Sequence, residues 1–452
     1  MNNIRATLTD FICAGAFGLP KKLSDGKFRS SRGGIGKKDA GHLYVKGTTD
    51  ADTMGVSVFS IPELSKGLFD ELPVTTASPF IDIEGQVDKH GQKNNRMTSM
   101  IEYNGYLIGG MIHNYEAGAD DTHFLWRYNG LVVEGLYANE GDYRAMGWIT
   151  PIPLEWQEAL GSTHIMGGGH NYSISGRASI GPSAFGVDLN QVTADVVVEP
   201  IKATAFMDYD RAKDHALFKT KYPEITAHHG LDNLRCNIEQ VDDPAIPGPN
   251  RVSYGDPLLG PTLGNDIWIS NTRSGIGFII PGTCTYAVIG TMYGLESGAA
   301  YRIRDDQGVQ YNGPHSYVQD DWTHMVWLFD VNDFLEVKAG TKKPYDMLPY
   351  EYHPIDIPLI TPTGNDGPSG ARRADIKNGC AIGNRIYLSL TGGDSSQPVI
   401  VAFDAAVGGV IEPPVLPPII EPPVIDPVID LVAKATQAAH DAIDNLVTEL
   451  TK

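Results

Sequence analysis

Two histidines and an arginine beside a glycine run are the first side chains that could do chemistry. His164 and His170 stand on either side of the glycines at 167–169. Arg177 follows in the same polar stretch. Consecutive glycines let backbone N–H groups approach an anion closely, and imidazole and guanidinium groups add further donors. We therefore expect His164, His170 and Arg177 to form a ligand-binding loop, with an ordinary glycine-rich connection as the alternative.

Closely spaced aspartates form a second group that could bind a ligand. Carboxylate oxygens in loops are the ligands that Ca²⁺ prefers, but full EF-hand spacing is absent from the chain. Solvated turns are the alternative, and Ca²⁺ is the one cofactor that the sequence leaves open. The candidate calcium ligands are Asp50, Asp52, Asp305 and Asp306.

No complete catalytic motif is present. The chain contains neither a GxSxG elbow nor an HExxH pair, and its 4 cysteines form no CxxC pair. Carboxylates that could act as an acid and a base are plentiful, but their separation cannot be read from a sequence. Catalytic residues therefore stay unassigned. The aromatic stretch 322–327 could be a sugar platform or part of a core strand.

Charge and hydropathy limit the partners. The 452 residues carry a formal charge of −20, and a field of this sign repels nucleic-acid phosphates and anionic membranes. No apolar run reaches the roughly 18 residues of a membrane-spanning helix. The apolar stretch 11–18 is short and follows Asp10, so we expect no signal peptide and synthesis in the cytoplasm.

The elements that must position these side chains are mainly β-strands. Across residues 38–407, short runs rich in Val, Ile, Tyr, Phe and Trp alternate with Gly, Asn and Asp clusters. Helical periodicity is confined to short stretches at 154–160 and 211–219. Asn-Gly pairs, which favour hairpin turns, occur at 104–105, 129–130, 312–313 and 378–379.

A loose repeat within this body predicts a β-propeller. The stretches 100–130 and 376–405 both read as strand, Gly/Asn turn, strand, polar loop and a strand that ends in an aromatic residue. Similar strand ends recur roughly 55–75 residues apart, a spacing typical of blades with long loops. We expect five to seven blades, because radial packing buries both faces of each sheet. A tandem β-sandwich is the alternative.

The body resembles the kelch-like and sialidase-like propellers. The kelch glycine doublet is matched at 109–110 and 392–393, although not at regular intervals. The Asp box of sialidases and the Trp-Asp dipeptides of other propellers are missing from this chain. The resemblance implies a propeller fold and, on the sialidase side, an activity on sugars.

Three further segments flank the body: an N-terminal arm at 1–37, a proline-rich linker at 408–427 and a helix at 428–452. The linker contains the nine-residue repeat EPPVLPPII and EPPVIDPVI, which favours a stiff polyproline II strut. The helix begins with an Asp-Pro N-cap pair and carries apolar residues at heptad spacing. We expect this tail to dock on a partner or to oligomerise. The docking candidates are Pro413, Pro414, Val415, Pro417, Pro418, Ile419, Pro422, Pro423, Ile429, Val432, Ala439, Ile443, Leu446 and Leu450.

An acidic β body with an attachment tail and no catalytic motif resembles, in overall character, the structural proteins of tailed-bacteriophage virions. We therefore expect a virion protein, such as a decoration, tail or fibre-base component, and not an enzyme. Its partners would be other subunits and host surface glycan, without nucleic acid. The alternatives are a polysaccharide-acting propeller enzyme, either glycosidase or lyase, and an interaction scaffold.

Overall fold

The structure is a computed structural model. It describes residues 4–20, 29–48, 53–67, 72–87, 96–113, 121–168, 181–209, 240–242, 252–254, 268, 272–293, 299–301, 308–309, 314–316, 318, 321–357, 376–390 and 398–407. The chain divides into two units, Met1–Pro414 and Val415–Lys452, and all described residues belong to the first. The predicted linker and terminal helix, with their docking candidates, lie outside the described residues.

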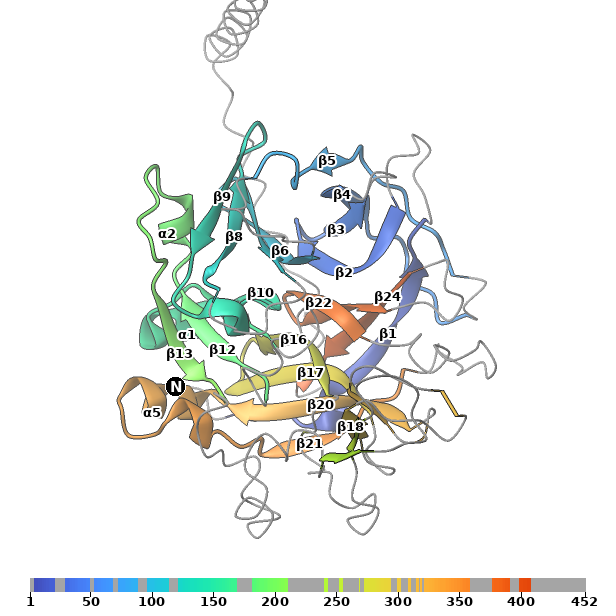
Figure 1. Ribbon diagram of the computed structural model, residues 1–452, viewed down its shortest axis with the longest axis vertical. Helices are drawn as coiled ribbons and strands as arrows, with labels where there is room; N and C mark the ends of the chain where they lie inside the picture. The colour runs from blue at the N-terminus through green and yellow to red at the C-terminus, as the bar shows by residue number, and fades with distance from the viewer. Residues whose placement is uncertain are drawn as a thin grey trace, which may run out of the picture. The chain divides into compact units, whose positions relative to one another are not determined.

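The described body has three four-stranded antiparallel sheets and one eight-stranded sheet, whose two antiparallel halves are joined by the parallel pair β2 and β6. We count each half as one blade, which gives five blades of a propeller (Figure 1). Blade 1 has β2 (Arg29–Lys37), β3 (His42–Thr48), β4 (Met54–Ser60) and β5 (Ile81–Asp82). Blade 2 has β6 (Arg96–Tyr103), β7 (Tyr106–Ile112), β8 (His123–Tyr128) and β9 (Val133–Ala138). Blade 3 has β10 (Trp148–Pro151), β11 (His164–Gly167), β12 (Ala184–Val187) and β13 (Ala203–Met207). Blade 4 has β16 (Arg273–Ile279), β17 (Thr285–Tyr293), β20 (Trp322–Asp330) and β21 (Glu351–Pro354). Blade 5 has β22 (Ile376–Ile382), β23 (Arg385–Leu390), β24 (Val399–Ala405) and β1 (Phe11–Gly18).

Smaller elements complete the described chain. Two strand pairs stand outside the blades: β14 (Gln240–Asp242) with β15 (Val252–Tyr254), and β18 (Ala299–Tyr301) with β19 (Pro314–Ser316). The α-helices are α1 (Leu154–Leu160), α2 (Asn190–Thr193) and α5 (Val331–Lys338). The 3₁₀ helices are η1 (Leu8–Asp10), η3 (Asp142–Ala145) and η6 (Pro344–Asp346). No described helix is long and apolar enough to cross a membrane.

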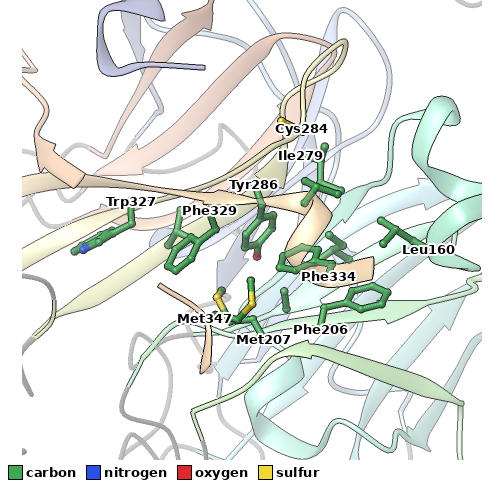
Figure 2. Close-up of a cluster of buried hydrophobic side chains, with 14 of the residues drawn as sticks. Leu160, Phe206, Met207, Ile279, Cys284, Tyr286, Trp327, Phe329, Phe334 and Met347 are labelled. Carbon is green, nitrogen blue, oxygen red and sulfur yellow. The ribbon is translucent and has the colours of Figure 1, made fainter. Parts of the chain in front are cut away.

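Both faces of every blade are buried, which is why the sheets pack radially. Along β17, Tyr286 and Val288 enter the cluster shared with blade 3, whereas Ala287 and Ile289 enter the cluster shared with blade 5. Five such clusters fill the five contacts between neighbouring blades. Figure 2 shows the one between blades 3 and 4, where Phe206 stacks on Phe334 at 5.3 Å. The predicted propeller is confirmed, and the tandem sandwich, whose sheets bury one face each, is excluded.

The first and last strands of the body close the ring. β1 pairs antiparallel with β24, from Phe11 opposite Ala405 to Gly18 opposite Val399. The N-terminal segment 1–37 was expected to be an arm, whereas the structure places β1 and β2 of that segment in blades. The reason is that Ala16 and Phe17 of β1 are fully buried against neighbouring strands, a stabilisation that a free arm would lack.

The inner strands β2, β6, β10, β16 and β22 share one direction, which gives the propeller two different ends. β2 and β6 pair in parallel, with Gly36 opposite Met100. We call the end where the inner strands begin the loop end and the opposite end the turn end. Connections at the turn end are tight hairpins, segments that carry α1, α2 or α5, or the longer link from β4 to β5, and all but residues 68–71 of them are described. At the loop end, only the connection between β9 and β10 is described in full.

Local sequence signals hold at some positions and fail at others. Asn104 and Gly105 form the expected hairpin turn, with φ values of 49° and 78°. The short helix expected at 154–160 is α1. By contrast, Asn378 and Gly379 lie inside β22, and the turn that follows this strand uses Gly383 instead. The valine-rich stretch 195–199 has the composition of a strand but is irregular chain, in which Val196 and Val198 are exposed.

Candidate functional site

The centre of the propeller is closed by one buried amide, Asn378. Its Oδ1 accepts from the backbone N–H of Ile35 at 2.9 Å, and its Nδ2 donates to the carbonyls of Gly147 at 2.9 Å and Gly275 at 3.4 Å. These partners come from blade 1, from the residue just before blade 3 and from blade 4. Glycine is needed around this amide because a Cβ at Gly275 would lie 2.5 Å from the Ile376 side chain. Asn378 therefore joins the blades at the axis and forms a polar floor below the loop end.

An ion triad lies at the loop end of blade 3, on the connection that is described in full. Arg144 bonds Asp142 through Nε at 3.1 Å and through Nη2 at 2.7 Å. Its Nη1 lies 3.1 Å from Oδ2 of Asp208. The three side chains are between 14 and 19% exposed, so they are largely desolvated and still reachable from solvent. We call Asp142, Arg144 and Asp208 the carboxylate triad.

The local fold positions this triad at the loop end of blade 3. Asp142 and Arg144 belong to η3, which ends shortly before β10, and Asp208 directly follows β13. Ser183 donates to the carbonyl oxygen of Arg144 and accepts from the N–H of Gly168 at 2.8 Å. A Cβ at Gly168 would lie 3.0 Å from that carbonyl oxygen, so glycine permits the close approach. The backbone under Arg144 is therefore fixed by blade 3 itself.

Two cations from neighbouring blades interact at the same end. Lys46 of β3 packs its aliphatic chain on the inner strand at Gly34, where an added Cβ would come within 2.6 Å of the lysine Cβ. Arg96 is the first residue of β6. Burial, and secondly the charge of Arg96, lowers the pKa of Lys46 to about 8, and Glu84 opposes the shift. Glu84 also accepts from the backbone N–H of Met54 at 2.8 Å.

Further cations begin the inner strands of the remaining blades. Arg273 opens β16, and Lys377 is the second residue of β22. Among the described residues, Arg96, Arg144, Arg273 and Lys377 thus stand at or just before the start of an inner strand, in a chain whose net charge is −20. Figure 1 shows β2, β6, β10, β16 and β22 around the centre of the propeller.

The predicted ligand loop is not brought together within the described residues. His164 begins β11 at the turn end, is 3% exposed, and contacts Thr163 Oγ1 through Nδ1 at 2.9 Å. Its ring meets Tyr103 edge-on at 4.8 Å. Burial, and secondly the charge of Lys37, lowers the pKa of His164 to about 3, so the imidazole is neutral. His170 and Arg177 lie outside the described residues.

The remaining two expected sites are the calcium ligands and the aromatic platform for sugar. Asp50, Asp52, Asp305 and Asp306 lie outside the described residues, so the calcium prediction stays untested. Among the described side chains, no group of three or more His, Cys, Asp or Glu residues could hold a metal ion. In the aromatic stretch, Trp327 is fully buried against Trp268 at 5.0 Å and belongs to the core. Trp327 is therefore not a surface platform for sugar.

The triad and the axial amide were missed in the sequence. Asp142 and Arg144 are close in the sequence, but Asp208 joins them only because β13 ends beside η3. Asn378 was interpreted as a turn residue. The one sequence signal that points to this end is the recurrence of a basic residue just before or at the start of inner strands, at Arg96, Arg273 and Lys377.

Comparisons with known proteins give structural matches only. No protein-family model and no curated protein matches the chain. One similar solved structure belongs to the GH130 family of mannoside phosphorylases, which contains glycoside hydrolases that target β-1,2 mannosidic linkages in Candida mannan. It matches with a TM-score of 0.39 and 10% identity over 88% of this chain and 96% of its own. A glycosyl hydrolase from Bacteroides ovatus matches with a TM-score of 0.35 and 9% identity over 88% of this chain and 90% of its own. A GDP-Man-dependent mannosyltransferase from Leishmania mexicana matches with a TM-score of 0.32 and 9% identity, over 87% and 90%.

These matches correct two expectations. The sequence was interpreted as that of a virion structural protein and not of an enzyme, whereas the solved structures named here are those of carbohydrate-active enzymes. The physical reason for the error is that the absence of a short catalytic motif was taken as absence of a site, although propeller sites are assembled from several blades. At these TM-scores the likeness identifies neither a substrate nor an active site.

Proposed function

We propose that the protein is an enzyme that cleaves polysaccharide at the loop end of the propeller, with Asp142 and Asp208 as its reactive carboxylates. The observation that carries the proposal is that one guanidinium, that of Arg144, hydrogen-bonds Asp142 and forms an ion pair with Asp208. Because the two contacts are made by different nitrogens of a single planar group, the contacted carboxylate oxygens are held within about 8 Å of each other. Glycosidases place their two carboxyl groups roughly 5–9.5 Å apart.

The surroundings of the pair suit this chemistry. An ion pair with arginine suits a carboxylate that acts as base or nucleophile, because both roles need a negative oxygen. Partial desolvation strengthens the electrostatic interaction of such an oxygen with a developing oxocarbenium charge. The proposal falls in the same broad class as the hydrolases named above, but it depends on Asp142, Arg144 and Asp208 and not on that likeness.

The test is polysaccharide cleavage by the full chain and by carboxamide variants. Wild-type protein is incubated with neutral and acidic polysaccharides, and both reducing ends and unsaturated products are measured. Asp142→Asn and Asp208→Asn should each lower the rate on the order of 100-fold or more, since a positioned acid–base group contributes about that factor.

The matched control is Asp404→Asn at the turn end. Asp404 also pairs with an arginine through two bonds, to Arg385 at 2.6 and 2.8 Å, so its loss disturbs a comparable ion pair away from the site. This variant should keep the wild-type rate. Undiminished rates in both triad variants, or a wild-type protein that cleaves no polysaccharide in the panel, would contradict the proposal.

A further inference from the structure

The connection that carries the triad has a strained backbone. Asp142 has a φ of 47°, in the left-handed region that residues with a side chain rarely adopt. Its carboxylate accepts from the backbone N–H of Arg144 at 2.9 Å as well as from the guanidinium, so both of these contacts depend on where Arg144 lies. Strained residues persist where the surrounding structure holds them, and they are common at active sites. The contacts that hold Arg144 therefore bear on Asp142 as well.

Ser183 holds the backbone of Arg144 from within blade 3. It directly precedes β12 and is fully buried. Its hydroxyl donates to the Arg144 carbonyl oxygen and accepts from the N–H of Gly168 at 2.8 Å, and the Gly168 carbonyl oxygen is a second acceptor at 3.3 Å. The N–H of Ser183 donates to that same Gly168 carbonyl at 3.1 Å. Because the hydroxyl is buried, its removal would leave the Arg144 carbonyl oxygen without this donor and without solvent in its place.

Ser183 is in turn held by blade 4. The hydroxyl of Tyr286, on β17, donates to the Ser183 carbonyl oxygen at 3.3 Å and accepts from Trp148 Nε1 at 3.2 Å. Burial raises the pKa of Tyr286, and the bond from Trp148 opposes the shift, so the hydroxyl keeps the proton that it donates. Figure 2 shows Tyr286 in the cluster between blades 3 and 4. A chain of polar contacts thus runs from this cluster through Ser183 to Arg144.

We propose that Ser183 is a positioning residue for the cleavage reaction, and that it acts through Arg144 to fix the separation of the two carboxylates of the triad. The inference rests on the proposed function and adds a residue that touches no substrate, because Ser183 is fully buried. Without the hydroxyl, the Arg144 peptide can shift, and its guanidinium then no longer holds Asp142 and Asp208 in one geometry. A displacement of about 1 Å can lower a rate about 100-fold, so the effect falls on kcat and not on KM.

The first experiment compares variants of the full chain in polysaccharide cleavage. Ser183→Ala should lower kcat about tenfold or more and leave KM within about twofold, whereas Ser183→Thr, which keeps a hydroxyl, should stay within about threefold of the wild-type kcat. Tyr286→Phe removes one bond of the polar chain and should lower kcat less than Ser183→Ala does. Thr150→Val is the matched control, because the buried Thr150 hydroxyl also donates to a backbone carbonyl, that of Gly277, at 2.8 Å. Its kcat should be that of the wild type.

A second measurement follows the Arg144 side chain without substrate. The Nε–H of Arg144 donates to Asp142 at 3.1 Å, so its exchange with water should be slow in the wild type and in Thr150→Val. In Ser183→Ala the exchange should be about tenfold faster, because the guanidinium leaves this bond more often. NMR of protein with isotope-labelled arginine measures the rate, and the loss of the signal in Arg144→Lys identifies it.

The two measurements separate this inference from the proposed function. Equal kcat values in Ser183→Ala and Thr150→Val, or equal exchange rates at Arg144 in these two variants, overturn the inference and leave the cleavage proposal to its own test. If the wild type cleaves no polysaccharide, the proposed function fails, and faster exchange in Ser183→Ala alone still supports the hold of Ser183 on Arg144. If Ser183→Ala does not fold, Tyr286→Phe takes its place in both comparisons.

Discussion

The two ends of the propeller are built from the same strands but differ in what their polar groups do. At the turn end, polar groups stabilise the chain: Arg5 pairs with Asp330, its guanidinium lies 4.8 Å over the ring of Tyr350, and Tyr350 donates to the Ala6 carbonyl at 2.8 Å. These contacts attach the N-terminal segment to blade 4. At the loop end, the described charged groups include the carboxylate triad, Lys46, Glu84 and Arg96.

This difference indicates that a propeller can carry its stabilising polar contacts at one end and its proposed reactive groups at the other. Turn-end charges sit in pairs of opposite sign that link elements distant in sequence, such as Arg5 with Asp330. At the loop end, Arg144 pairs with two carboxylates, and burial together with the charge of Arg96 lowers the pKa of Lys46, a shift that Glu84 opposes. Perturbed charged groups of this kind are typical of functional sites. The predictions below act on this contrast between the two ends.

The largest expected effect concerns ring closure by β1. Phe17 is fully buried between blades 5 and 1, so Phe17→Ala should lower the free energy of unfolding by about 3–5 kcal/mol. Ile12 lies on the same strand and is 46% exposed, so Ile12→Ala is the matched control and should cost less than about 1 kcal/mol. Denaturant unfolding measures both, and equal small losses would show that β1 does not close the ring.

The next effect concerns the axial amide that separates the two ends. Asn378→Ala leaves the buried Ile35 N–H and Gly147 carbonyl without their partner, which should cost about 2–4 kcal/mol. Asn190→Ala removes an exposed amide at the turn end and should change stability by no more than about 0.5 kcal/mol. If the two variants unfolded at the same denaturant concentration, the axial amide would have no special role.

Sequence reasoning found the parts of this fold that depend on local pattern. The near-continuous apolar run of β24 and the Asn104-Gly105 turn are readable, because burial on two faces and positive φ each leave a local signature. Pairings between distant residues leave none. Asn378-Gly379 has the signature of a turn, yet the amide is used to join three blades. The triad needs Asp208, which only the closure of blade 3 brings to Arg144.

A smaller effect is expected from pH, through the lowered pKa of Lys46. Lys46 has its pKa lowered to about 8, so between pH 7 and 9 it changes from mostly charged to mostly neutral. The stability of the fold should rise as the pH increases from about 8 towards the unperturbed value of 10.5, because only the unfolded chain still binds the proton. Denaturant unfolding at several pH values measures this change.

Lys46→Met serves as the control for this pH effect. Methionine does not titrate, so the rise in stability above pH 8 should be smaller in this variant than in the wild type. Equal changes in the two proteins would show that Lys46 does not cause the effect.

The smallest expected effect is that His164, at the turn end, does not titrate in the usual range of a histidine. His164 has its pKa lowered to about 3, mainly by burial, so its ring resonances in an NMR titration should stay constant from pH 8 down to about 4. Because the unfolded chain takes up that proton near pH 6.5, this histidine makes the fold lose stability as the pH falls from about 6.5 towards 3. A His164 signal that titrated near pH 6.5 would place the ring in solvent, available to a ligand, and would remove the distinction between a structural turn end and a chemical loop end.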